Sequence, residues 1–470
     1  MAPTESRDEG MTVWAAPRLR SVDPTTEEVI EEFDWSSPAE VEAAVAGASR
    51  AVARHAGRGP VERAEWLRGA AARLRSQRDQ LADVATREMG KTRTEARAEV
   101  EKCATAFEHY ARVGPELLAD VDVASDARRS VVAFEPLGPI LAVMPWNFPY
   151  WQVVRHAAPA LLAGNAILLK HAPSTTRCGL ELAELLRAAG VPEGLFSVLR
   201  IDTDVVAGVI ADPRVRGVTV TGSPRAGSAV ARVAGEHLKK TVLELGGSDA
   251  FIVLDDADLP AAVDTALGSR FQNCGQSCIA AKRFLVHEAV GEEFEERFAK
   301  GASQLVVGDP HDAATQLGPM ARDDLRETLE HQYAQAIDAG ARLLCGGGRG
   351  LERGWYHQPT VLAECDPNML VMREETFGPL AAVMRVRDED AAVAVANASG
   401  YGLGGNVWTG DAERGLRVAR RLESGSAFVN GMTHSDPRLP FGGIKRSGHG
   451  RELGDIGLRE FVNVRTLWVG

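Results

Sequence analysis

The sequence predicts an α/β protein of two domains, each containing a parallel β-sheet, and three observations support this prediction. The chain has 470 residues, whereas single domains usually have roughly 100 to 200. After Gly138, short apolar runs alternate with helical segments, and a second series of such runs begins at Phe251. Strands alternating with helices are typical of βαβ units, whose parallel sheets are buried on both faces. We place the change between the domains near Gly246 and Gly247.

The part of the chain before these strands is predicted to be mostly helical. Residues 1–20 show no periodicity and are interpreted as a leader. Residues 37–40 (SPAE) form a capping box with proline at the first helical position, so a helix is expected from there toward His55. From Val61 to about Val113 apolar residues recur with a spacing near 3.6, which indicates amphipathic helix.

The strands of the two sheets are predicted from the apolar runs. The first sheet is expected to use residues 139–144, 166–169, 196–199, 218–220 and 241–243, and the second residues 251–254, 283–286, 341–344 and 427–429. Two further strands, 130–134 and 462–469, belong to neither series. Extra strands with exposed edges usually pair with a strand of another subunit, so we predict an oligomer.

Composition excludes several classes of protein. The chain has 65 acidic and 53 basic residues and a formal charge of -12, which argues against a nucleic-acid partner. No apolar run approaches the roughly 20 residues that span a bilayer, and no signal peptide is apparent, so no membrane association and a cytoplasmic location are expected. The six cysteines are thinly spread and only Cys274 and Cys278 lie close together, so we predict neither a disulfide scaffold nor a metal site.

Two residues are candidates for catalysis because of their positions beside a glycine and at the end of a strand. Cys278 comes after Gly275, where the backbone can approach a ligand closely, although a lone cysteine is more often a small buried apolar residue. Glu244 ends an apolar strand, and such carboxyl ends line the ligand crevice of open α/β sheets. The alternative for Glu244 is a solvated strand end or an ion pair.

Two loops that follow strands are candidates for ligand contact. Residues 145–149 (PWNFP) form a turn fixed by two prolines, in which Asn147 can donate a hydrogen bond to a developing oxyanion. The alternative is a rigid turn with an aromatic plug. Residues 221–227 (TGSPRAG) follow a strand and open a helix, an arrangement that suits a pyrophosphate, although the spacing is not that of the common dinucleotide motif.

With these residues in place, the sequence resembles the aldehyde dehydrogenase superfamily from about Ser21 to Gly470. The resemblance rests on PWNFP at 145–149, ILLK at 167–170, TGSPRAG at 221–227, LELGG at 243–247, GQSC at 275–278, EETFGP at 374–379 and PFGGIKRSGHGRE at 440–452. Within the superfamily it looks most like bacterial succinate-semialdehyde dehydrogenases, as in LLKHAPS at 168–174, QSCIAAKRF at 276–284 and GRELGDIGLREF at 450–461.

The resemblance implies an NAD(P)-dependent oxidation of a small aldehyde through a thioester. In this interpretation Cys278 attacks the aldehyde, Asn147 and the Cys278 backbone N–H stabilise the oxyanion, and Glu244 activates the hydrolytic water. It also implies a set of cofactor-binding residues: Trp146, Lys170, Ser174, Gly222, Ser223, Gly227, Glu375 and Phe377. Among these, Glu375 is expected at the nicotinamide ribose, Phe377 beside the nicotinamide, Lys170 at the adenosine ribose and Ser223 at the pyrophosphate.

NADP is the favoured cofactor, with NAD as the alternative. Members of the family that prefer NAD commonly carry a glutamate three residues after the lysine that corresponds to Lys170, whereas here the residue is Pro173. Without that carboxylate a 2′-phosphate meets no repulsion, and Lys170 and Ser174 are available to bind it.

The substrate predicted from the resemblance is succinate semialdehyde or a similar ω-carboxylate aldehyde. Such enzymes hold the distal carboxylate with arginines and a serine; Arg155 matches one of these positions, and Ser435 lies in the loop before PFGG that usually borders the substrate tunnel. A second expected arginine is replaced by Gln272, and Arg438 is a candidate to supply its charge. Cys274 is interpreted as a packing residue, with a reversible disulfide to Cys278 as the alternative.

The resemblance also implies the domain organisation and an assembly. Residues 20–115 and 137–246 would form a Rossmann-type cofactor domain, residues 247–445 a second such domain for catalysis, and residues 116–136 with 446–470 a small β arm for a homodimer or homotetramer. Alternative functions are a broad aliphatic or aromatic aldehyde dehydrogenase, a cofactor-independent thiol esterase, and a catalytically silent member of the family.

Overall fold

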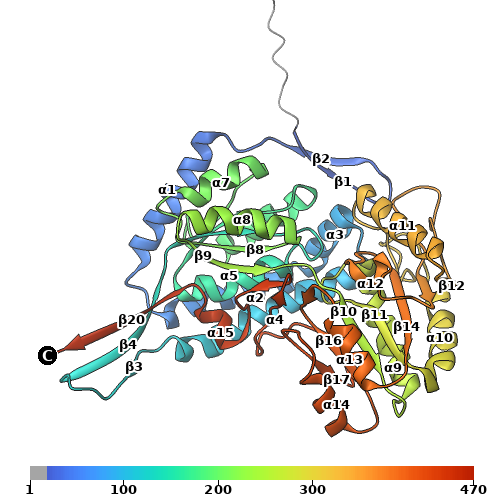
Figure 1. Cartoon of the computed structure of the whole chain (residues 1–470). Coiled ribbons are helices and arrows are strands. Elements are labelled where there is room, and N and C mark those ends of the chain that lie inside the picture. Colours follow the sequence, from blue (N-terminus) through green and yellow to red (C-terminus); the bar gives the residue numbers. More distant parts are fainter. Residues whose placement is uncertain (1–17) are drawn as a thin grey trace, which may run out of the picture.

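The computed structural model describes residues 18–470, and Figure 1 shows two large β-sheets side by side, each covered by helices. The first sheet contains β5, β6, β7, β8, β9 and β19, in the order β19-β9-β8-β5-β6-β7. All pairings in it are parallel except that between β19 and β9. The α/β fold class is therefore confirmed. The bounds are β5 Pro139–Val143, β6 Ala166–Lys170, β7 Phe196–Val198, β8 Gly217–Thr221, β9 Lys240–Glu244 and β19 Gly448–His449.

The second sheet has the order β12-β13-β14-β11-β10-β16-β17, with parallel pairings except that between β12 and β13. Three of its strands, β13, β14 and β16, are absent from the sequence prediction. Strands β13 and β16 are four residues long, and the run LAAVMRV of β14 fits a buried helix as well as a strand. The bounds are β10 Asp249–Val253, β11 Ala281–His287, β12 Arg342–Cys345, β13 Thr360–Ala363, β14 Leu380–Val386, β16 Gly405–Trp408 and β17 Phe428–Val429.

A third, small sheet forms an arm that extends from the first sheet and ends at the C-terminus (Figure 1). It consists of β3 (Val121–Asp122), β4 (Arg129–Pro136) and β20 (Val462–Val469). The two strands that belonged to neither predicted series pair with each other, antiparallel, from Val462 opposite Pro136 to Val469 opposite Arg129. This pairing satisfies the backbone hydrogen-bonding groups along one edge of each strand. Val464 and Trp468 on β20 remain 60% and 61% exposed.

The N-terminal region begins with a strand hairpin, β1 (Leu19–Val22) and β2 (Val29–Phe33). The predicted leader lies outside the described residues except for its last three, of which Leu19 and Arg20 are in β1, so the prediction is wrong there. Helix α1 (Pro38–His55) starts at the predicted capping box: Ser37 Oγ accepts from Glu40 N at 3.2 Å, and the Glu40 carboxylate accepts from Ser37 N at 2.7 Å.

The predicted helical stretch from Val61 is divided into three helices, α2 (Pro60–Ser76), α3 (Arg78–Met89) and α4 (Arg93–Leu117). The second break has a local cause. Gly90 adopts a left-handed conformation with φ of 82°, and Thr92 caps α4 by accepting from Glu95 N. These helices pack against one another and against α5 (Trp151–Ala163) and α6 (Thr176–Ala188), and they belong to the same hydrophobic core as the first sheet.

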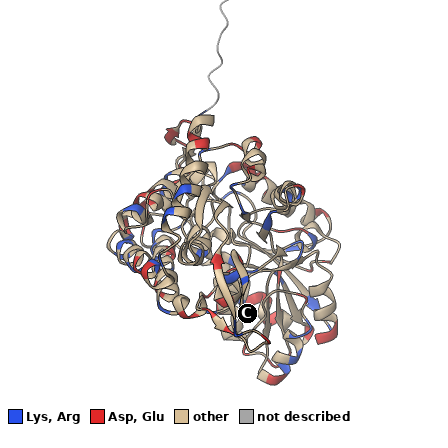
Figure 2. Cartoon of the chain, turned by 90° about the vertical axis from the view of Figure 1, so that its left-hand side faces the viewer, with Lys and Arg blue, Asp and Glu red and all other residues tan. Residues whose placement is uncertain are grey.

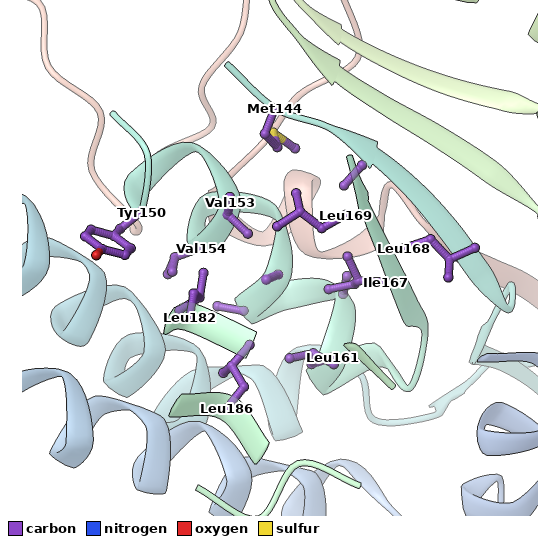
Figure 3. Close-up of a cluster of buried hydrophobic side chains, with 14 of the residues drawn as sticks. Met144, Tyr150, Val153, Val154, Leu161, Ile167, Leu168, Leu169, Leu182 and Leu186 are labelled. Atoms are coloured by element: carbon purple, nitrogen blue, oxygen red, sulfur yellow. The ribbon is translucent and has the colours of Figure 1, made fainter. Parts of the chain in front are cut away.

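The remaining helices follow strands and cover the two large sheets. Figure 3 shows how α5 and α6 bury apolar side chains beside β6: Val154 and Leu161 lie with Leu182, Leu186 and Ile167. Each such side chain contributes about 1.5–3 kcal/mol on burial. The bounds are α5 Trp151–Ala163, α6 Thr176–Ala188, α7 Thr203–Ala211, α8 Pro224–Glu236, α9 Leu259–Phe271, α10 Glu288–Ser303, α11 Asp323–Asp338, α12 Leu370–Arg373, α13 Glu389–Asn397, α14 Ala412–Ala419 and α15 Gly454–Arg459, with the short pieces η1 Pro173–Thr175, η2 Gln272–Gly275, β15 Tyr401–Gly402 and β18 Ile444–Lys445.

The surface carries both signs of charge. Figure 2 shows Lys and Arg residues interspersed with Asp and Glu residues along the ribbon on the side of the molecule that bears the arm. Within residues 18–470, no helix is both long and apolar enough to cross a bilayer.

Candidate active site

Cys278 lies on a tightly turned loop between α9 and β11. Three successive residues at the start of this loop, Asn273, Cys274 and Gly275, have positive φ values of 54°, 52° and 67°. A Cβ at Gly275 would lie 2.3 Å from the Gly378 carbonyl oxygen, so only glycine fits there. Arg270 Nη2 donates to the carbonyl oxygens of Gly275 at 2.6 Å and Gly378 at 2.7 Å, which holds the loop against the segment before β14.

The Cys278 side chain is partly exposed and lines two cavities, one on each side of it. Lys282 Nζ donates to the carbonyl oxygens of Ser277 at 2.9 Å and Cys278 at 2.8 Å, and this fixes the backbone that carries the thiol. Burial raises the pKa of Cys278 to about 11, although Arg155 and Lys282 oppose the rise. The thiol is therefore protonated at neutral pH in the ligand-free protein.

Glu244 ends β9, in the lining of one of these cavities. It is 2% exposed, and neither carboxylate oxygen has a hydrogen-bond partner among the described residues. Burial raises the pKa of Glu244 well above its ordinary range, with Glu452 adding to the rise and Arg155 opposing it. A carboxyl group with these properties can exchange a proton with a nearby water or thiol.

Asn147 connects the PWNFP turn to the Cys278 loop. Its Nδ2 donates to the Gln276 carbonyl oxygen at 3.0 Å, and Asn273 Nδ2 donates to the Asn147 carbonyl oxygen at 2.9 Å. One N–H of the Asn147 amide remains for a ligand. Asn147 lines the same cavity as Glu244 and Cys278, so the structure brings the three predicted catalytic residues together.

This cavity, which we call the cofactor groove, has a volume of about 430 Å³ and runs from Cys278 to the N-terminus of α8. At that end Ser223 caps α8 by accepting from Ala226 N at 3.3 Å, and Gly222 precedes it. Along the groove Trp146 and Phe377 pack edge to face with ring centroids 5.7 Å apart. A groove with a helix N-terminus at one end and aromatic walls at the other fits a dinucleotide.

Glu375 also lines the groove, and it lies beside a residue that the sequence analysis missed. The Glu375 carboxylate accepts from Gly247 N at 3.0 Å and forms an ion pair with Lys282 at 3.4 Å. Lys282 is fully buried and so links the Cys278 loop to a predicted cofactor residue. Its signal in the sequence is weak, because a single lysine at a strand start is ordinary.

Three predicted cofactor residues, Lys170, Ser174 and Gly227, are not among the side chains that line the groove. Lys170 ends β6, and burial lowers its pKa. The Ser174 hydroxyl has no partner within the described part of the chain. A Cβ at Gly227 would lie 2.5 Å from a Leu245 side-chain carbon, so this glycine allows α8 to pack closely on the segment after β9.

The second cavity, on the other side of Cys278, we call the substrate cavity. Its volume of about 260 Å³ lies just below the roughly 300–1,000 Å³ of sites for drug-sized ligands, which favours a small substrate. Most of its walls are apolar, including Phe148, Trp151, Ile279 and Phe441. Gln272 and the two predicted substrate residues, Arg155 and Ser435, line it too.

Arg155 is engaged by the protein itself. Its guanidinium forms an ion pair with Glu452, donates to Thr221 Oγ1 at 3.2 Å, and lies 4.7 Å from the Phe441 ring centroid. Both side chains are buried, and in this ion pair each charge neutralises the other. Glu452 and Thr221 thus already use part of the hydrogen-bonding capacity of Arg155. Binding of a substrate carboxylate by Arg155 stays a prediction.

The two other residues considered for this region lie elsewhere. Arg438 is exposed, pairs with Asp436, and is not part of the cavity lining. Cys274 is buried in the core of the second sheet, and burial raises its pKa. Its predicted packing role agrees with that position, while the disulfide alternative stays a prediction.

A sequence model of the aldehyde dehydrogenase family matches residues 14–467. The chain belongs to the aldehyde dehydrogenase family. It is 47% identical over 451 residues to the probable succinate-semialdehyde dehydrogenase [NADP(+)] of Synechocystis sp., covering 96% of this chain and 99% of that one. It is 45% identical over 458 residues to the succinate semialdehyde dehydrogenase [NAD(P)+] of Escherichia coli, covering 97% and 99%.

Solved structures of the same family superpose closely on this aldehyde dehydrogenase. The succinic semialdehyde dehydrogenase of Streptococcus pyogenes in complex with NADP+ matches with a TM-score of 0.94 and 38% identity, covering 96% of this chain and 99% of that one. The succinate-semialdehyde dehydrogenase of Burkholderia pseudomallei matches with a TM-score of 0.94 and 36% identity, covering 96% and 94%. The predicted membership of this family is thus confirmed.

The Arg155–Glu452 pair generates a prediction about stability. Arg155→Ala leaves Glu452 buried without its partner, which typically costs about 3–5 kcal/mol, so we expect a lower apparent melting temperature by calorimetry. The double variant Arg155→Ala/Glu452→Gln should recover part of the loss, because it no longer buries a lone carboxylate. An unchanged melting temperature in Arg155→Ala would contradict the structural role.

The raised pKa of Cys278 generates a prediction about reactivity. Because the thiolate is the nucleophile, the rate of Cys278 alkylation by iodoacetamide in the absence of ligands should keep rising with pH from 7 to 10. Peptide mapping by mass spectrometry measures this rate, and Cys278→Ala identifies the contribution of other cysteines. A rate that reaches its plateau below pH 8 would show that the thiol ionises readily and would sink the prediction.

Proposed function

We propose that the protein oxidises succinate semialdehyde, or a similar ω-carboxylate aldehyde, to the carboxylic acid with NADP as the favoured cofactor. The observation that carries this proposal is the position of Cys278 between the cofactor groove and the substrate cavity. The thiol is therefore accessible to both reactants. The names of the relatives from Synechocystis sp. and Escherichia coli support the choice of substrate.

In the proposed mechanism the chain supplies the nucleophile, the oxyanion donors and the base. Glu244, in the same cavity, takes the proton of the Cys278 thiol and passes it to solvent. Cys278 attacks the aldehyde carbon, and the Asn147 amide N–H and the Cys278 backbone N–H stabilise the oxyanion. NADP, when bound in the groove, supplies the hydride acceptor. Glu244, whose carboxylate lacks partners in the described structure, then takes a proton from the water that hydrolyses the thioester on Cys278.

Cofactor preference is proposed to depend on the segment after β6. Pro173 begins η1 and is exposed, so no carboxylate projects from this position. Lys170 is three residues earlier. Burial lowers the pKa of Lys170, and the negative charge of Asp202 acts in the opposite direction. Lys170 and Ser174 are the proposed contacts of the 2′-phosphate, while Trp146, Gly222, Ser223, Glu375 and Phe377 are the proposed contacts of the rest of the cofactor.

A homodimer or homotetramer and a cytoplasmic location stay proposals. The oligomer is supported by the arm, where β20 is the outer strand of its sheet and exposes apolar side chains, among them Val464 and Trp468. Exposed apolar strand edges are typical sites of pairing between subunits.

The proposed function is tested with a panel of aldehydes and both cofactors. We expect kcat/KM, measured from the absorbance of the reduced nicotinamide, to be higher for succinate semialdehyde than for butanal and benzaldehyde, and higher with NADP than with NAD. Equal efficiencies across the panel would favour the broad aldehyde dehydrogenase. Ester hydrolysis without any cofactor-dependent oxidation would favour the thiol esterase.

Pro173→Glu tests the basis of cofactor preference. The new carboxylate should repel the 2′-phosphate and accept hydrogen bonds from the ribose hydroxyls of NAD, so the ratio of kcat/KM with NADP to that with NAD should fall about tenfold or more, equivalent to roughly 1.4 kcal/mol. Pro173→Gln is the matched control, since it has the same shape without the charge. If both variants keep the wild-type ratio, position 173 does not set the preference.

A further inference from the structure

The substrate cavity contains four charged side chains besides its apolar walls: Glu95, Glu99, Lys102 and Arg155. The two carboxylates are engaged by the protein. Glu99 accepts from the backbone N–H groups of Tyr150 and Trp151 at 2.8 and 2.9 Å and pairs with Lys91. Glu95 accepts from the backbone N–H group of Thr92, its partner in the capping box of α4, and from that of Asn273.

Of the two cations, Arg155 pairs with Glu452, as described above. Lys102, on α4, is different. No carboxylate lies within ion-pair distance of Lys102 Nζ in the part of the chain that the structure describes, although the side chain is half-buried. Asp436, next to Ser435 in the chain, forms an ion pair with the exposed Arg438 instead.

The ammonium of Lys102 is held in a defined position. Its Nζ lies 4.3 Å from the Trp151 ring centroid and donates to Ser435 Oγ at 2.8 Å. That hydrogen bond is the one acceptor contact of Nζ among residues 18–470, so two of its three N–H groups are available to a ligand.

Ser435 can donate a hydrogen bond to the same ligand. Its Oγ accepts from Lys102 Nζ and also from Trp151 Nε1 at 3.2 Å. Because a hydroxyl oxygen has two lone pairs, both acceptor positions are then filled, and the hydroxyl hydrogen remains as a donor. A cation and a hydroxyl donor held side by side at the wall of an apolar cavity form a site for one carboxylate.

We infer that Lys102, together with Ser435, binds the distal carboxylate of the substrate and thereby selects ω-carboxylate aldehydes over neutral ones. This inference rests on the proposed function and adds the residue that recognises the acidic end of the substrate. Lys102 supplies the net charge that the neutral Gln272 and the neutralised Arg155 do not supply in this cavity.

The cavity explains why such an interaction discriminates strongly. Burial, together with the charge of Arg155, lowers the pKa of Lys102 to about 8, while Cys103, Glu99 and Asp436 act in the opposite direction. The unpaired ammonium is therefore costly to bury, and a bound carboxylate removes that cost. A neutral aldehyde leaves the ammonium without a counter-charge.

The test compares succinate semialdehyde with butanal in the wild type and in Lys102→Met, a substitution that keeps the length of the side chain and removes its charge. The ratio of kcat/KM for the two aldehydes should fall about 10- to 100-fold, as expected for loss of a charge-assisted hydrogen bond. Lys102→Arg should keep more of the ratio than Lys102→Met. The exposed Lys300, at the end of α10, provides the charge-matched control Lys300→Met, which should leave the ratio unchanged.

A second readout uses succinate as a competitive inhibitor of butanal oxidation. The inhibition constant of succinate should rise in Lys102→Met and should rise less in Ser435→Ala. A merely structural role of Lys102 would not weaken the binding of succinate in this way. If Lys102→Met does not fold, Lys102→Gln gives the same comparison.

The outcomes separate the two proposals. A wild type that shows no preference for succinate semialdehyde over butanal contradicts the proposed function. A preference that is present in the wild type and survives in both Lys102→Met and Lys102→Gln overturns this inference alone.

Discussion

The cationic side chains buried around Cys278 need hydrogen-bond acceptors, and this constraint holds the loop that carries Cys278. Arg270 donates to the carbonyl oxygens of Gly275, Gly378 and Ala281, and Lys282 donates to those of Ser277 and Cys278. An unsatisfied buried cation costs several kcal/mol. The loop thus supplies acceptors to both cations, and a change of its path would break these hydrogen bonds.

The same constraint divides the site into two chemically different halves. On the cofactor side, the excess positive charge of Lys282 is met by Glu375, and the groove ends at the N-terminus of α8. On the substrate side, Arg155 is met by Glu452, and the walls are otherwise mostly apolar. Cys278 lies between the halves, and Glu244 lies close enough to Glu452 for its pKa to be raised by it. Burial raises the pKa of both Cys278 and Glu244, so proton transfer at either group depends on a ligand or on a neighbouring group.

Periodicity predicted most of the fold because the strands of parallel sheets are continuous apolar runs. Strands β5, β6, β8 and β10 were found in this way. Of the missed strands, β13 and β16 are only four residues long, and the run LAAVMRV of β14 would also suit a buried helix. The arm shows another limit: the apolar pattern identified β4 and β20 as strands, but their mutual pairing depends on bringing together segments more than 300 residues apart.

By itself the sequence determined the α/β class from its apolar runs, and the family and the catalytic candidates from local motifs such as GQSC and PWNFP. Tertiary structure decided what the isolated residues are free to do. It brought Cys278, Glu244 and Asn147 into one cavity, engaged Arg155 with Glu452, and turned Gly227 into a packing residue against Leu245. It also placed Lys102 of α4 beside Ser435, 333 residues away along the chain. The reason is physical: the availability of a charge depends on every neighbour within a few ångströms, and those neighbours come from distant parts of the chain.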